Sequence, residues 1–326
     1  MYYYELALLK SPLNNLTFQS EKKIILGKKV LIKLKQRKNL DEAVVIKEVE
    51  KPTFKCSDIV EITNEYFDEK MQQIASFVSQ YYVCSLGEAL SVYIPFDENI
   101  NPIFNEEKFD SKIVLSAQQE KAKEFLKDKK QALLFADTGA GKTEVYIKII
   151  EEHLNANKQA ILLMPEISLT PQMQKRLEKV FGKSIAIWHS KITKKKKEEI
   201  LKGLQEGSIR LIAGARSALF LPYSNLGVIV VDEEHDDSYK SDSKPRFHTK
   251  DLSIYMAKKF DLQLVLGSAT VSSSSFFKIP FFRLDETYHQ TKKYYSFEDS
   301  EAKLSLKVID KITKTIDSGN QVIVFL

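Results

Sequence analysis

Two hydrophobic patterns alternate between residue 113 and about residue 290. Short continuous apolar runs, such as 159–164 (QAILLM) and 226–231 (LGVIVV), are typical of strands buried on both faces of a parallel sheet. Between these runs, apolar positions recur three or four residues apart, which predicts helices that cover the sheet. The alternation predicts an α/β fold with a mostly parallel, doubly wound sheet. The predicted strands are 132–136, 159–164, 184–187, 209–213, 226–231 and 262–266, and the predicted helices include 116–126, 170–180 and 193–206.

The first 94 residues follow a pattern of their own. From Lys22 to Asn39, eight basic residues and no acid are interleaved with apolar positions, which predicts strands that turn at Gly27 and share one basic face. A basic face near aromatic residues suits single-stranded nucleic acid, because cations follow the backbone while rings stack on bases. A lysine-rich edge strand, kept charged against aggregation, fits the same composition, so both interpretations stay open. The aromatic residues are Tyr2, Tyr3, Tyr4 and Phe18.

These patterns divide the chain into four parts. Residues 1–94 are predicted to form a small, mainly β domain with a helix at 71–82, and residues 95–112, which carry two prolines among mixed polar residues, a linker. Residues 113–290 form the α/β lobe. Residues 291–326 are interpreted as a connector with a helix at 302–317, followed by a strand at 321–326 (QVIVFL) that would begin a second lobe.

A candidate phosphate-binding loop lies between the predicted strand 132–136 and the helix that follows it. Gly139 and Gly141 allow backbone dihedrals that a side chain would forbid, so successive N–H groups can point at an anion. The helix N-terminus adds positive potential, Lys142 can reach the β- and γ-phosphates, and Thr143 offers a hydroxyl to Mg²⁺. Ala136 replaces the first glycine of G-x-x-x-x-G-K-[ST], and the loop taken alone also fits a glycine turn before a core helix. The predicted cradle comprises Ala136, Asp137, Thr138, Gly139, Ala140, Gly141, Lys142 and Thr143.

An acidic sequence, DEEH at 232–235, directly follows the apolar run 226–231. Ligands bind at the carboxyl ends of strands in open α/β sheets, so these side chains should face the same cleft as the phosphate-binding loop. Asp232 would hold Mg²⁺, and Glu233 would orient or deprotonate the attacking water. An acidic run after a strand is otherwise most often a solvated turn, but here the two motifs complete one another's chemistry. Together they predict a RecA-like P-loop NTPase lobe with ATP and Mg²⁺ as cofactors.

Composition narrows the remaining classes of protein. A net charge of +5 among 326 residues permits nucleic-acid binding without requiring it. The chain opens without a leader pattern and no apolar run approaches the length of a membrane span, so we expect a cytoplasmic protein without a membrane partner. Cys56 and Cys84 are too few and too far apart for a disulfide framework or a zinc site, so no zinc ligands are expected in this chain.

Several further motifs follow TGAGKTEVY (138–146) in a fixed order: PEISLTPQ (165–172), WHS (188–190), GARSALFLP (214–222), DEEHDDSYK (232–240) and GSAT (267–270). In this order they resemble the PriA family of superfamily 2 replication-restart DNA helicases. The segments 6–20 (LALLKSPLNNLTFQS) and 81–90 (YYVCSLGEAL) resemble the 3′-end-binding domain of that family. The resemblance covers nearly the whole chain and implies that it corresponds to the N-terminal half of such a helicase.

The resemblance also implies roles for individual residues. Gln119 would contact adenine, His235 would relay the nucleotide state to the DNA track, and Ser268 and Thr270 would couple hydrolysis to strand movement. The implied DNA contacts are Glu166, Ser168, Arg216 and Ser217 along a single-strand track, Tyr239, Arg246, Phe247 and His248 in an aromatic-rich loop at 236–251, and Phe18, Gln19 and Lys55 in a 3′-end pocket. The sequence departs from the family pattern at Pro245, where tryptophan is common, at Gln19, where an acid is usual, and at Lys35, a glycine position.

The implied function is ATP-dependent, 3′-to-5′ DNA unwinding at stalled or branched replication forks, with primosome assembly for replication restart. The implied partners are branched and single-stranded DNA, primosome proteins, single-strand-binding protein and the replicative helicase loader. In the family, arginine fingers and a zinc insertion belong to a second lobe, which would follow Leu326. The family also commonly has a winged-helix domain between the 3′-end-binding domain and the first lobe, where this sequence has only residues 95–112. This chain alone should therefore bind ATP and DNA but not unwind. Two alternatives are a nucleotide-gated, non-catalytic fork-binding scaffold and a double-strand translocase of the restriction type.

Overall fold

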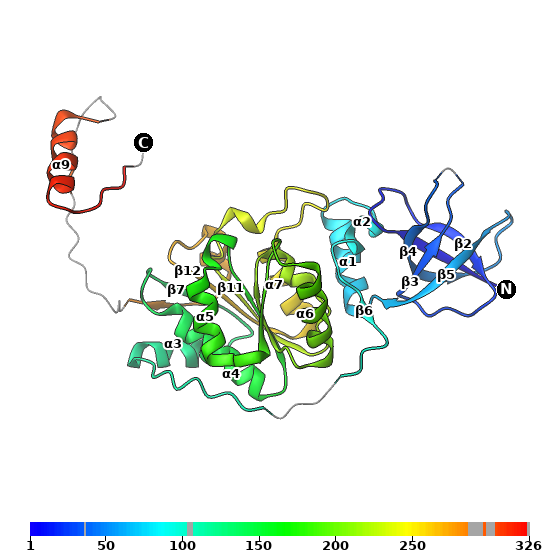
Figure 1. The fold of residues 1–326 in the computed structure, drawn as a ribbon, viewed down its shortest axis with the longest axis horizontal. Coiled ribbons are helices and arrows are strands. Elements are labelled where there is room, and N and C mark those ends of the chain that lie inside the picture. Colours follow the sequence, from blue (N-terminus) through cyan, green and yellow to red (C-terminus); the bar gives the residue numbers. More distant parts are fainter. Residues whose placement is uncertain (36, 103–106, 286–295, 298–303, 325–326) are drawn as a thin grey trace. The chain divides into compact units, whose positions relative to one another are not determined.

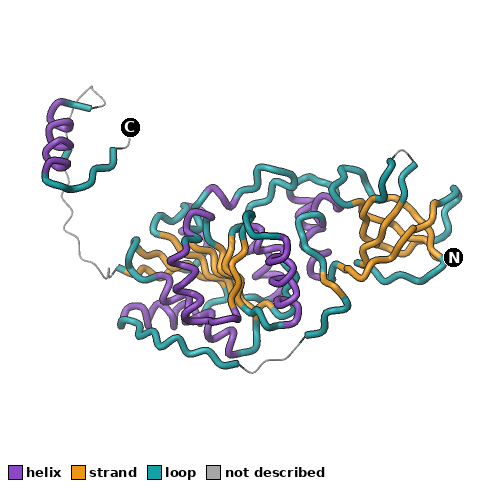
Figure 2. Tube along the Cα trace, in the orientation of Figure 1, coloured by secondary structure: helices purple, strands orange, loops and turns teal. Residues whose placement is uncertain are grey.

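The computed structural model describes residues 1–35, 37–102, 107–285, 296–297 and 304–324. Two compact units are present, Met1–Tyr288 and His289–Leu326. The first unit contains a small N-terminal sheet, blue in Figure 1, and a larger parallel sheet layered between helices, as Figure 2 also shows. The functional candidates named above all belong to this first unit.

The N-terminal sheet curls into a small barrel-like fold. Its strands follow the order β2-β1-β4-β3-β5-β6. The edge strand β2 also pairs with β5, which lies next to the opposite edge, and this pairing curls the sheet back on itself. The buried side chains of Tyr4, Leu6 and Val30 lie among those that fill its core. The strands are β1 (Tyr2–Leu8), β2 (Leu16–Ser20), β3 (Lys28–Ile32), β4 (Asp41–Val49), β5 (Ser57–Tyr66) and β6 (Phe96–Asp97), with α1 (Glu69–Tyr81) and α2 (Leu86–Leu90) between β5 and β6.

The prediction for residues 22–39 is confirmed in part. The chain turns at Gly27, which has φ +84° and donates its N–H to the Val45 carbonyl, and β3 follows the turn, but residues 22–26 do not form a strand. The first lysines of β3 are also neutralised by acids on other segments. Lys28 is buried and pairs with Glu98, and the Lys29 ammonium lies 2.6 Å from the Glu65 carboxylate. The strand therefore does not offer a free cationic surface.

The second sheet has seven parallel strands in the order β13-β7-β12-β11-β8-β10-β9. Helices α3, α4 and α5 cover one face of the sheet, and α6 and α7 cover the other. Successive residues of β11 therefore enter two separate hydrophobic cores. Val228 and Val230 belong to one core, and Ile229 and Val231 belong to the other. This confirms the predicted doubly wound α/β fold. The strands are β7 (Gln131–Ala136), β8 (Gln159–Leu163), β9 (Ile185–Trp188), β10 (Leu211–Gly214), β11 (Leu226–Asp232), β12 (Gln263–Ser268) and β13 (Phe281–Leu284). The helices are α3 (Ala117–Lys127), α4 (Lys142–Asn155), α5 (Pro171–Phe181), α6 (Lys194–Glu206), α7 (Thr249–Phe260) and α8 (Ser273–Lys278).

Helix α1 and the segment after α2 pack directly on the parallel-sheet part of the same unit. The rings of Phe77 and Tyr255 stack with their centroids 3.7 Å apart, and the Ile94 N–H donates to the Phe220 carbonyl at 3.0 Å. Such contacts combine apolar burial with paired backbone groups. They hold the N-terminal helices against the elements that follow β10 and β11.

We expect two buried tyrosines of this unit to respond differently to loss of the hydroxyl. The Tyr93 hydroxyl is buried without a hydrogen-bond partner among the described residues, whereas the Tyr4 hydroxyl accepts from the Ile24 N–H at 2.8 Å. Tyr93→Phe should leave the free energy of unfolding unchanged or raise it by up to about 1 kcal/mol, because no bond is lost. Tyr4→Phe should lower it by about 1–2 kcal/mol, because a buried N–H is left unpaired. Urea unfolding measures both, and a loss above about 1 kcal/mol in Tyr93→Phe would contradict the assignment.

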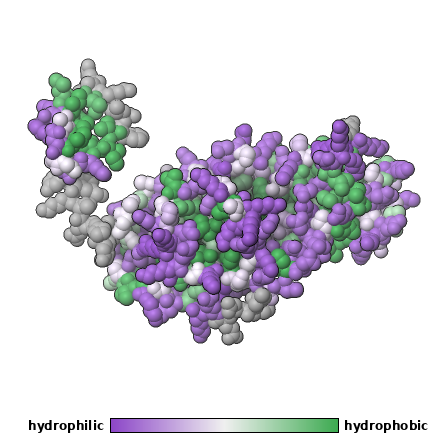
Figure 3. Space-filling view, viewed as in Figure 1, coloured by the Kyte–Doolittle hydropathy of each residue, from purple (hydrophilic) through white to green (hydrophobic). Residues whose placement is uncertain are grey.

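The C-terminal unit contains α9 (Leu306–Asp317), whose apolar side chains Leu306, Ile309 and Ile316 are exposed. Figure 3 shows hydrophobic residues gathered along one side of this helix. The helix was predicted from residue 302, and residues 302–303 lie outside the described part of the chain. The strand predicted at 321–326 is not formed over residues 321–324, where no neighbouring strand pairs with the backbone, and residues 325–326 are also outside the described part. None of the described helices is both long and apolar enough to cross a membrane.

Candidate nucleotide and nucleic-acid site

The loop 137–141 joins β7 to α4 at the carboxyl end of the parallel sheet. Gly139 and Gly141 both have φ +84°, a left-handed conformation that side chains rarely adopt. A Cβ added at Gly139 would meet no atom within 4 Å, so open space adjoins the loop. Helix α4 begins at Lys142 without a side-chain cap, which leaves its first N–H groups for an anion. These features fit a bound phosphate.

The phosphate-binding loop and the DEEH segment meet at this edge of the sheet. The Lys142 ammonium lies 3.3 Å from Glu233 Oε1 and donates to the Ala136 carbonyl at 3.2 Å. Asp232 is buried beside them, and burial, followed by the nearby Glu233 carboxylate, raises the pKa of Asp232 to about 6. A cation bound here would stabilise the ionised form of Asp232, which offsets both its burial and its repulsion by Glu233. The Asp232 carboxylate and the Thr143 hydroxyl supply oxygen ligands of the kind that Mg²⁺ prefers, and these two residues would hold the cation.

Glu233 adopts φ +47°, a left-handed conformation that is uncommon for residues other than glycine. The backbone on either side holds it there, because the Glu234 N–H donates to the Gly267 carbonyl and the Asp236 N–H donates to the Glu233 carbonyl. Strained backbone of this kind is concentrated at functional sites. Here it lets two consecutive residues, Asp232 and Glu233, reach the same loop.

Gln119 lies against the phosphate-binding loop. Its Oε1 accepts from the Ser116 N–H at 2.8 Å, completing a capping box at the start of α3, and its Nε2 is 3.3 Å from the Gly141 carbonyl. On the other side of the loop, Asp137 pairs with Arg283 at 2.8 Å. Sequence reasoning missed Arg283, because it belongs to β13, a four-residue strand absent from the predicted elements. The predicted contact between Gln119 and adenine stays a prediction.

The three residues predicted to couple hydrolysis to movement lie together. His235 Nδ1 is 2.7 Å from the Ser268 hydroxyl, and His235 Nε2 is 3.0 Å from the Thr270 hydroxyl. Ser268 ends β12, whose residue Gly267 pairs with Asp232 on β11. These contacts connect the DEEH segment directly to the end of β12 and the segment after it.

A buried ion pair below the DEEH segment was not found from the sequence. Glu234 Oε2 accepts from the Lys250 ammonium at 2.8 Å, and both side chains are less than a tenth exposed. The same carboxylate accepts from the Ser272 and Ser275 hydroxyls and, through Oε1, from the Ser272 N–H. The network joins the end of β11 to α7 and α8. No local sequence pattern indicates this network, because the partners of Glu234 lie 16 to 41 residues away from it in the chain.

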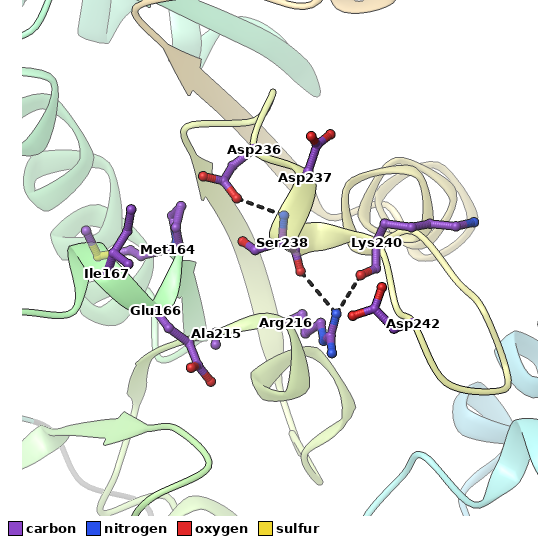
Figure 4. Close-up of a pocket in the computed structure, with 11 residues that line it drawn as sticks. Met164, Glu166, Ile167, Ala215, Arg216, Asp236, Asp237, Ser238, Lys240 and Asp242 are labelled. Carbon is purple, nitrogen blue, oxygen red and sulfur yellow. Dashed lines mark hydrogen bonds between the residues drawn. The ribbon is translucent and has the colours of Figure 1, made fainter. Parts of the chain in front are cut away.

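A cleft of about 430 Å³ opens beside this site and contains two of the predicted DNA-track residues, Glu166 and Arg216 (Figure 4). Glu166 begins η1 (Glu166–Ser168), and Arg216 begins η3 (Arg216–Phe220). The Arg216 guanidinium donates to the carbonyls of Ser238, at 3.3 Å, and Lys240, at 2.5 Å. Arg216 is thus tied to the loop after DEEH while still lining the cleft. Ser168 is half-buried and Ser217 is exposed, close to these residues in the chain.

Two of the predicted DNA contacts in the loop 236–248 have buried side chains in this structure. Tyr239, in η4 (Asp237–Tyr239), is buried, and its hydroxyl donates to the Asp232 carbonyl at 2.6 Å. Phe247 is buried against Phe220, with ring centroids 4.7 Å apart. Both side chains serve the hydrophobic core and are not accessible to DNA here. Arg246 is exposed, and His248 is half-buried with its backbone N–H donating to the Tyr82 hydroxyl at 3.1 Å.

The three side chains predicted to form the 3′-end pocket differ in their surroundings. Phe18 is buried in the core of the N-terminal barrel, so its ring cannot stack on a base in this structure. Gln19 Nε2 donates to Asp58 Oδ1 at 2.8 Å, and Lys55 is exposed in the loop before β5. The alternation of a strand explains the difference, because neighbours in β2 point to opposite faces.

Comparison with known proteins defines the class to which this architecture belongs. The DEAD/DEAH box helicase model matches residues 116–278, which is half of the 326 residues. The chain therefore belongs to the DEAD/DEAH box helicase family. A model described as the 3′ DNA-binding domain (3′BD) of PriA matches residues 10–95, so the expected resemblance to the PriA family is confirmed in both parts of the chain.

The curated relatives are named replication restart protein PriA. The protein from Helicobacter pylori strain J99 is 40% identical over 337 residues, covering 100% of this chain and 52% of the relative. The protein from Bacillus subtilis strain 168 is 38% identical over 208 residues, covering 60% of this chain and 26% of the relative. The chain thus spans about half the length of the Helicobacter relative. Among solved structures, RecG bound to a three-way DNA junction has a TM-score of 0.44 and 19% identity, covering 63% of this chain and 27% of that chain.

Proposed function

We propose that this chain binds MgATP and DNA and supplies the first nucleotide-binding lobe of a DNA helicase that restarts replication at stalled or branched forks. The observation that carries the proposal is the meeting of Lys142 with Asp232 and Glu233 beside an open glycine loop. MgATP, when bound, supplies the phosphoanhydride bond whose hydrolysis releases free energy. Lys142 then exchanges Glu233 for phosphate oxygens, which frees Glu233 to orient water, while Asp232 and Thr143 hold the cation.

The proposal extends to the other site residues. Gln119 contacts the adenine, and His235, Ser268 and Thr270 pass the nucleotide state to the DNA cleft. Arg216 and backbone groups near Glu166, Ser168 and Ser217 hold DNA phosphates there. Arg246, His248, Gln19 and Lys55 are further DNA contacts, and residues 1–94 and 113–290 act as the DNA-binding domain and the helicase lobe.

The proposal extends to the complete helicase. It moves 3′ to 5′ along single-stranded DNA in the cytoplasm, and it assembles a primosome with single-strand-binding protein and the replicative helicase loader. The names of the relatives support a role in replication restart. Arginine fingers and a zinc insertion belong to a second lobe, so residues 1–326 by themselves bind both ligands without unwinding DNA. In support, the described residues contain one seven-stranded parallel sheet.

Binding of a fluorescent forked DNA tests the proposal. If about four phosphates are neutralised, log K should fall with log salt at a slope of about −3. Arg216→Ala should weaken binding and reduce the magnitude of the slope by about 1, because one phosphate contact is lost. Lys194→Ala, which removes a fully solvated lysine of α6, is the matched control. An affinity independent of salt, or equal losses in both variants, would contradict DNA binding at this cleft.

A further inference from the structure

We infer that Tyr146 is a positioning residue for the magnesium ligand Asp232, an inference that rests on the proposed function. The Tyr146 hydroxyl donates to Asp232 Oδ1 at 3.0 Å. Tyr146 is 1% exposed and Asp232 is 8% exposed, so water does not compete freely for this bond. The sequence pattern accounts for Tyr146 only as an apolar position of the helix after the loop. The buried hydroxyl adds a second role, because it donates a hydrogen bond to Asp232.

One turn of α4 reaches the first two carboxylates of the DEEH segment. Lys142 and Tyr146 are four residues apart, so they share one face of the helix. Lys142 contacts Glu233, and Tyr146 contacts Asp232, the preceding residue. The helix that follows the phosphate-binding loop therefore sets the position of both acids, one through an ammonium and the other through a hydroxyl.

Gly267 on β12 leaves the space that the Tyr146 hydroxyl occupies. It stands directly opposite Asp232 in the pairing of β11 with β12. A Cβ added at Gly267 would lie 1.6 Å from the Tyr146 hydroxyl oxygen and 2.7 Å from the ring carbon that carries it. Any side chain at this position would push the hydroxyl away from Asp232. Helix α4 and strands β11 and β12 thus converge on one hydrogen bond.

A hydroxyl that donates to a buried carboxylate fixes its orientation before a cation arrives. Outer-shell donors of this kind commonly change metal affinity by about 10–100-fold when they are removed. Tyr146→Phe keeps the ring and its packing and removes only the donor. The variant should therefore bind nucleotide normally without divalent cation but require more Mg²⁺ for the tight complex.

The experiment titrates Mg²⁺ into the full chain with a fluorescent ATP analogue, and Mn²⁺ binding by electron paramagnetic resonance gives a second readout. Tyr146→Phe should raise the half-saturating Mg²⁺ concentration about tenfold, with the affinity in EDTA unchanged. Gly267→Ala should shift the same quantity in the same direction. Tyr223→Phe is the matched control, because its buried hydroxyl donates instead to the Ala218 carbonyl at 2.8 Å.

The outcomes separate this inference from the proposed function. An unchanged or lower half-saturating Mg²⁺ concentration in Tyr146→Phe would overturn the positioning role alone, provided that the wild-type chain binds the analogue and Lys142→Ala does not. An equal rise of the half-saturating Mg²⁺ concentration in Tyr223→Phe would also overturn the positioning role, because a hydroxyl that donates to the Ala218 carbonyl would then matter as much as the Tyr146 hydroxyl. Failure of the wild-type chain to bind the analogue would overturn the proposed function and this inference with it.

Discussion

Lys142→Ala is expected to lower the affinity of the chain for MgATP about a hundredfold while leaving the fold intact. The ammonium is the only cation that the described residues place beside both the glycine loop and the DEEH carboxylates, and it is about a tenth exposed. Charge-assisted bonds from such a buried group to phosphate oxygens contribute about 3 kcal/mol, which corresponds to this factor. Among the described residues, Lys142 pairs with Glu233, whose side chain is 27% exposed, and donates to the Ala136 carbonyl, so the loss of Lys142 should cost little stability.

Equilibrium titration with a fluorescent ATP analogue measures the effect. Lys148→Ala is the matched control, because Lys148 lies further along α4 and pairs with Glu151 instead. Adenosine, which has no phosphates, should bind the wild-type chain and Lys142→Ala equally. A Lys142→Ala protein that binds MgATP as tightly as the wild type would exclude the loop as the phosphate site. In a full-length helicase, unwinding that survives this change without ATP binding would favour the non-catalytic scaffold.

The sequence pattern predicted the strands that carry this site well, because each strand is specified by residues next to one another in the chain. A continuous apolar run such as 226–231 specifies a strand buried on both faces, and the rule that ligands bind at the carboxyl ends of strands placed Asp232 and Glu233 beside Lys142. The structure confirms the six predicted strands of the lobe, with ends within two residues. Strand β13 escaped prediction because it is short and only one of its four residues is buried.

The contacts that the sequence could not predict all depend on tertiary register. The lysines at the start of β3 look like a free basic face until Glu65 and Glu98, from β5 and a distant loop, are placed against them. Tyr239 lies in a polar, acidic segment typical of an exposed loop, yet its hydroxyl reaches the Asp232 carbonyl. Such pairings depend on which strands become neighbours, and a one-residue change of register would reverse them.

The Glu234–Lys250 pair is the clearest case, because a single buried carboxylate holds three elements together. Burial alone would raise the pKa of Glu234, but hydrogen bonds from Lys250, the Ser272 N–H and Ser275 outweigh it and hold that pKa below its ordinary value. A carboxyl whose folded pKa is lowered contributes stability above its unfolded pKa, and that contribution disappears as the pH falls through the folded pKa. The network should therefore matter most at neutral pH.

Lys250→Met is expected to lower the free energy of unfolding by about 3 kcal/mol at pH 7, because it leaves a buried carboxylate without its cation. The serine donors that remain on Glu234 keep the loss at the lower end of the range for broken buried pairs. Without Lys250, burial should raise the pKa of Glu234, so the deficit should begin to shrink above the ordinary pKa of a glutamate, about 4.3, and continue to shrink below it, because protonation removes the unpaired charge.

Urea unfolding at a series of pH values tests this expectation against two controls. Lys258→Met, at an exposed position of the same helix, should change the free energy of unfolding by less than about 0.5 kcal/mol. The double variant Glu234→Gln with Lys250→Met leaves no buried charge, while the amide oxygen introduced at position 234 can still accept from the Ser272 N–H, so it should be more stable than Lys250→Met alone. A deficit that does not vary with pH, or a double variant less stable than Lys250→Met, would show that packing of the lysine stem, and not its charge, stabilises the end of β11.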